Sequence, residues 1–129
     1  MEDTELFFLL LNVMIVTLIL LAMLGMAVII FGSMILQNIY NYAVSAHLVL
    51  GVFAGVLSLL IVAFSTRFYD TKMTVISLAA AVVIWAGRAA GYIYIYAYGG
   101  SLFSYLIAVS TVLGFGLYVW LWAAAVKAG

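Results

Sequence analysis

The feature that most constrains this chain is a series of long apolar runs that carry almost no charge. The first of them, residues 6–31, extends for 26 residues without a charged side chain. An α-helix of about 20 residues crosses the hydrocarbon core of a bilayer. Of the 129 residues, 71% are hydrophobic and only 6% are charged, which is too apolar for a small soluble domain. The chain is therefore expected to have lipid as its solvent.

Polar or charged segments separate four such runs. They predict an all-α integral membrane four-helix bundle, in which residues 1–129 form a single transmembrane domain. Residues 92–98, YIYIYAY, alternate with the period of a strand, but a lone strand in lipid would leave its backbone groups unpaired. This segment is therefore interpreted as the end of the third helix. The four transmembrane helices are predicted at about 6–31, 36–65, 74–98 and 101–126.

Charged and aromatic residues near the ends of the spans predict the orientation. Arg67, Lys72 and Lys127 all lie on the side of the N-terminus, and the other two loops carry no Lys or Arg. The positive-inside rule then places both termini in the cytoplasm of a multi-pass protein of the cell (plasma) membrane.

Aromatic rings favour the headgroup level, and a belt of such rings is predicted from Tyr92, Tyr94, Tyr96, Tyr98, Trp120 and Trp122.

Arg88 is the one full charge inside a span, in the apolar run 74–100. Inserting an arginine at this depth costs a few kcal/mol, so its position predicts a function. Three interpretations are open: the side chain reaches carbonyl groups and stacks on Tyr92, it meets an anionic group of another subunit or cofactor, or it attracts a transported anion. No acid of the chain is expected within its reach, because all four lie at the cytoplasmic rim: Glu2, Asp3, Glu5 and Asp70.

His47 is the only histidine, and it shares a helix face with Gly51 and Gly55. An imidazole beside a surface without side chains suits a flat macrocycle, which leads to a haem b hypothesis with His47 as axial ligand and Arg88 on a propionate. A packing role for His47 and the glycines, and a proton or quinone role, are the alternatives. A second axial ligand would come from a histidine of another chain or from one of four methionines, Met14, Met23, Met26 and Met34.

Small residues predict where helices approach closely. Glycines four residues apart let helix backbones come together, and the predicted packing positions are Gly51, Gly55, Gly87 and Gly91. The chain has no Cys, no paired carboxylates, no Ser-His-Asp set, no metal-ligand cluster and no phosphate loop. Its net charge is zero, so it has no basic surface for nucleic acid. Catalysis by this chain alone is not expected, and a place in an oxidoreductase complex stays open.

The segment HLVLG at 47–51, followed by a basic turn at Arg67 and two further helices, carries a family resemblance. It resembles the small cytochrome-b-like or accessory membrane subunits of respiratory quinol and cytochrome oxidase complexes, over about half of the chain. The resemblance implies a non-catalytic subunit that packs against other integral membrane subunits and lipids. The alternatives are a small homo-oligomeric channel or transporter that uses Arg88 for an anion, a structural coat or envelope protein, and a haem-b-binding subunit.

Overall fold

The computed structural model describes residues 3–32, 37–96 and 101–128, with Tyr69 and Asp70 as the only connection among them. These residues form four helices, which confirms the predicted all-α four-helix fold. Each helix is long and apolar enough to cross a membrane. The helices are α1 (Asp3–Gly32), α2 (Gln37–Phe68), α3 (Thr71–Tyr96) and α4 (Ser101–Ala128).

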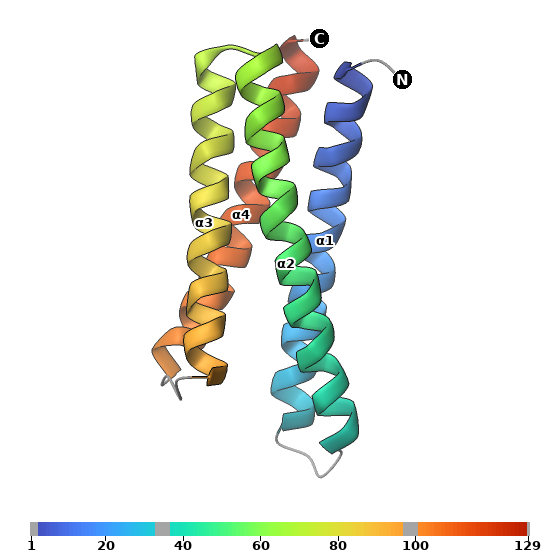
Figure 1. Ribbon diagram of the computed structural model, residues 1–129, viewed down its shortest axis with the longest axis vertical. Coiled ribbons are helices and arrows are strands. Elements are labelled where there is room, and N and C mark those ends of the chain that lie inside the picture. Colours follow the sequence, from blue (N-terminus) through green and yellow to red (C-terminus); the bar gives the residue numbers. More distant parts are fainter. Residues whose placement is uncertain (1–2, 33–36, 97–100, 129) are drawn as a thin grey trace.

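Successive helices run antiparallel, and each packs on its neighbour in the chain, with α1 and α4 closing the bundle. The start of α1, the end of α4 and the connection between α2 and α3 lie together at one end, which we call the terminus end (Figure 1). The α1–α2 and α3–α4 hairpins diverge toward the opposite end, which we call the far end (Figure 1). The two ends of the bundle are therefore packed differently.

The connection between α2 and α3 is tighter than the segment 66–73 that separates the predicted helices 36–65 and 74–98. Helix α2 continues to Phe68, and α3 already begins at Thr71. The backbone N–H of Met73 donates to the Asp70 carboxylate at 3.0 Å, so Asp70 caps the first turn of α3. The Tyr69 ring packs on Phe7 of α1, with ring centroids 4.7 Å apart, and burial raises the pKa of the Tyr69 hydroxyl. Hydrogen bonding and ring packing thus allow two residues to make the connection.

The large buried side chains gather in the terminus half of the bundle. On α1 they recur every three or four residues, as the core face of a helix requires. Leu57 and Ile61 of α2 and Leu121 of α4 pack against them. The fully or almost fully buried members on α1 are Phe7, Leu11, Met14 and Leu18.

The outer surface is apolar on all four helices. Val16, Val49, Val82 and Val112 are each more than half exposed and belong to α1, α2, α3 and α4 in turn. A soluble monomer rarely exposes so continuous an apolar surface, whereas lipid covers one at no cost. Of the predicted aromatic belt, the exposed rings are Tyr92, Trp120 and Trp122, while Tyr98 and the side chains of Tyr94 and Tyr96 lie outside the described residues.

Candidate functional site

Arg88 extends from α3 across to the glycine face of α2. Its Cδ lies 3.2 Å from where a Cβ would stand at Gly55, and its Nη1 lies 4.0 Å from the same position at Gly51. A larger residue at Gly55 would meet the aliphatic part of the arginine. The two glycines therefore leave space for the Arg88 side chain against the α2 backbone.

Trp85 packs beside this arginine. Its ring centroid lies 5.3 Å from the guanidinium carbon of Arg88, within the range of a cation–π interaction. Trp85 also packs on α2, because its Cζ2 lies 3.1 Å from the Cβ position of Gly55. Sequence reasoning missed Trp85 and considered Tyr92 instead. The available signal was the spacing, since residues three apart are neighbours on a helix.

The charge of Arg88 lacks a complementary group within the described chain. Its Nη1 is buried, and among the described residues no atom accepts a hydrogen bond from it. Asp3, Glu5 and Asp70 belong to the terminus end, whereas Arg88 is about 26 Å along α3 from Thr71 at the usual helical rise. Burying part of a cation without an acceptor is costly, so an anionic or polar group from outside these residues would stabilise it.

His47 points to a different neighbour. Its Nε2 lies 4.0 Å from the Cβ position of Gly25, on α1. Each step of four residues turns the side-chain direction by about 40°, so the face defined by His47, Gly51 and Gly55 rotates by about 80°. That rotation carries it from α1 to α3. The structure therefore places His47 and Arg88 at similar depths but against different helices.

This arrangement does not fit a haem between His47 and Arg88. The glycine face that would receive a macrocycle is covered by Trp85 and the Arg88 side chain. The Nε2 side of the imidazole is turned to the backbone of α1. Of the candidate second ligands, Met14 is fully buried in the terminus half, Met23 and Met26 are exposed, and Met34 lies outside the described residues.

The predicted packing glycines differ in how closely a neighbour approaches. A Cβ at Gly87 would overlap the Ser110 hydroxyl and stand 2.9 Å from the Ser110 Cβ, whereas at Gly91 the nearest atom is Ile107 Cδ1 at 3.9 Å. Gly114 of α4, which the pattern did not single out, is buried against Ile84. The closest helix contact among these is thus between Gly87 of α3 and Ser110 of α4.

A second polar feature was not predicted: buried hydroxyls inside the bundle. Ser58, Ser65 and Tyr118 are all fully buried. The Tyr118 hydroxyl approaches Ser58 from α4 without forming a hydrogen bond of good geometry. Ser58 and Ser65 are seven residues apart, a spacing that keeps them on one helix face, and this was the signal in the sequence.

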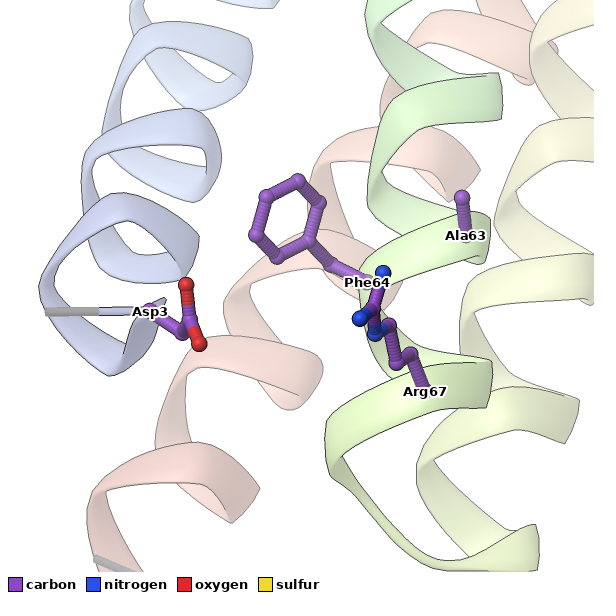
Figure 2. Close-up of a pocket in the computed structure, with 4 residues that line it drawn as sticks. All are labelled: Asp3, Ala63, Phe64 and Arg67. Carbon is purple, nitrogen blue, oxygen red and sulfur yellow. The ribbon is translucent and has the colours of Figure 1, made fainter.

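An open cleft of about 280 Å³ lies at the terminus end, lined by Asp3, Ala63, Phe64 and Arg67. Figure 2 shows the Asp3 carboxylate on α1 directed toward the side of α2 that carries Arg67 and Phe64. Opposite charges on its two walls give the cleft no net attraction for an ion of either sign. Within the described residues, no three His, Cys, Asp or Glu side chains come together as a metal site.

Comparisons with protein-family models, with curated proteins and with solved structures found no match to this chain. A function for this chain is therefore inferred from the environment of Arg88.

Proposed function

We propose that this protein is a non-catalytic accessory subunit of a larger integral membrane complex, of the respiratory or redox class, in the plasma membrane. The supporting observation is Arg88, whose buried Nη1 has no acceptor among the described residues. Arg88 as a whole is only partly buried, so an anionic group of a partner subunit, placed beside α2 and α3, would pair with its charge. Glycine-lined helix faces and an apolar outer surface suit close lateral packing in lipid.

The proposed topology has both termini in the cytoplasm. Arg67 lies in the last turn of α2, Lys72 in the first turn of α3 and Lys127 in the last turn of α4, so all three belong to the terminus end. The positive-inside rule assigns that end to the cytoplasm. The respiratory assignment is supported by the HLVLG segment and the helices after it.

The test is a native pull-down from membranes, with mass spectrometry and an absorption spectrum of the same sample. Large redox subunits should co-purify with the wild-type chain and with Arg88→Lys, which keeps the charge, but not with Arg88→Leu. Leaving a buried partner anion unpaired costs about 3–5 kcal/mol, enough to dissociate most complexes. Arg67→Gln is the control for the loss of a positive charge at the rim. Unchanged recovery of partners with Arg88→Leu would contradict the proposal.

A second candidate is a small homo-oligomeric channel or transporter for an anion. The observation in its favour is that Arg88 points toward α2 of the same chain rather than outward. Anion flux into proteoliposomes that contain only this chain, lost with Arg88→Leu while the oligomer persists, would favour this function over the subunit role.

A further inference from the structure

The buried hydroxyls and Arg88 lie at successive heights along the bundle, and we call this set the polar row. Counted from Phe68 at the usual rise, Ser65 and Ser58 lie about 5 and 15 Å along α2. Counted from Ala128, Tyr118 lies about 15 Å along α4, level with Ser58. Arg88 follows at about 26 Å along α3. Polar groups thus continue from the terminus end to the middle of the apolar span.

Three members of this row lack a hydrogen-bond partner within the described residues. In the described part of the chain, the buried side-chain atoms without a partner are Ser65 Oγ, Arg88 Nη1 and the Tyr118 hydroxyl, and all three belong to the row. Ser65 and Tyr118 are fully buried. In folded proteins most such atoms are satisfied by protein or by ordered water, so each of the three is a position where water is expected.

Ser58 adds an acceptor to the row. Its hydroxyl donates to the Gly55 carbonyl at 2.6 Å, which leaves its oxygen lone pairs open. The Tyr118 hydroxyl comes toward it from the opposite helix. Ala80 and Ala81 of α3, small and buried, lie at about the same level. A buried position with two or more hydrogen-bonding groups is where internal water binds.

We propose that this row binds a file of internal water molecules that connects the terminus end of the bundle to Arg88. Water at Ser65 and between Ser58 and Tyr118 satisfies the two hydroxyls, and water at Arg88 accepts from Nη1. The guanidinium is then solvated from the terminus end although it lies deep in the span. This inference does not depend on the identity of a partner subunit, because it concerns only groups of this chain.

The test is hydroxyl-radical footprinting of the full chain in lipid nanodiscs, with radicals generated in place from water by a synchrotron pulse. Tyr118 and Phe7 are a matched pair, since both are fully buried aromatic residues. Phe7 is the closer of the two to the terminus end, at about 6 Å along α1, but belongs to no polar row. Tyr118 is expected to be labelled about tenfold faster than Phe7, because bound water supplies radicals beside it.

Labelling of Tyr118 at the rate of Phe7 would mean a dry interior and would overturn the proposal. The Tyr118→Phe variant supplies an independent measurement. If water binds the hydroxyl, this variant lowers both the labelling at position 118 and the thermal midpoint. If the hydroxyl is buried dry and unpaired, its removal raises the midpoint, and that result would also overturn the proposal.

Discussion

The terminus half and the far half of this bundle are held together in different ways. In the terminus half, large side chains such as Leu11, Ile61 and Leu121 are completely buried between four helices. In the far half the hairpins diverge (Figure 1), and the described contacts there include glycines against polar side chains: Gly25 against His47, and Gly51 against Arg88. Large apolar packing therefore stabilises the terminus half, whereas small residues bring helices together at these contacts of the far half.

The difference shows why Arg88 is tolerated where it is. A charge placed among the large side chains of the terminus half would displace several of them at once. At the start of the far half, Gly51 and Gly55 leave space for the Arg88 side chain, and Trp85 packs beside it. The charged group thus lies where the bundle changes from tight apolar packing to glycine-based packing.

The largest expected effect on stability comes from truncating a large side chain in the core of the terminus half. Leu121→Ala removes a fully buried side chain and should lower the free energy of unfolding by roughly 2–5 kcal/mol. Leu113→Ala, on the same helix but 53% exposed, should change it by less than about 0.5 kcal/mol. Denaturant titration of both variants in mixed micelles measures the difference. Equal effects would mean that the terminus half is not the main source of stability.

The next effect concerns the closest helix contact near the far half. Gly87→Ala should cost about 1–3 kcal/mol, because its Cβ would meet the Ser110 side chain and push α3 from α4. Gly91→Ala has room and should be neutral or stabilising by up to about 1 kcal/mol. The same titration compares them. The double variant Gly87→Ala, Ser110→Gly should recover most of the loss, and failure to recover would exclude this contact as the cause.

A smaller effect is expected at the connection of the terminus end. Asp70→Ala removes the carboxylate that accepts from the Met73 N–H and should cost about 1 kcal/mol, whereas Asp70→Asn should retain most of the cap. Thermal unfolding in detergent measures both. A loss as large with asparagine as with alanine would show that the negative charge, rather than the hydrogen bond, is what stabilises the start of α3.

The helices could be predicted because apolar length in lipid leaves few other structures, but details that depend on contacts between helices could not. The end of α2 at Phe68 depends on the Asp70 cap and on Tyr69 packing against Phe7. Counting residues put His47 and Arg88 at similar depths. Which helix each residue faces depends on how the side-chain direction rotates along α2 and on how α1 and α3 pack against α2. Residue spacing alone does not predict either.

The interior polar row illustrates the same limit. The serines of α2 are visible in the sequence, yet serine is common in membrane helices and usually bonds its own backbone, as Ser58 does to Gly55. Only the packed bundle brings Tyr118 of α4 toward Ser58. A tyrosine near two tryptophans at the end of a span would otherwise be assigned to the membrane interface.

The smallest effect lies at the boundary between the two halves, where Gly55 and Gly51 differ by one turn. Gly55→Ala should be less stable than Gly51→Ala by about 1 kcal/mol, because its Cβ would press on the rigid Trp85 ring at 3.1 Å and on Arg88 at 3.2 Å. The helix-propensity gain from alanine is shared by both variants, so the difference isolates the contact. In a Trp85→Ala, Arg88→Ala background the two substitutions should become equivalent, since the groups that Gly55 accommodates are gone. If the difference persists in that background, Gly51 and Gly55 allow the helix backbones to approach rather than accommodate the arginine. The boundary between the halves then does not depend on Arg88.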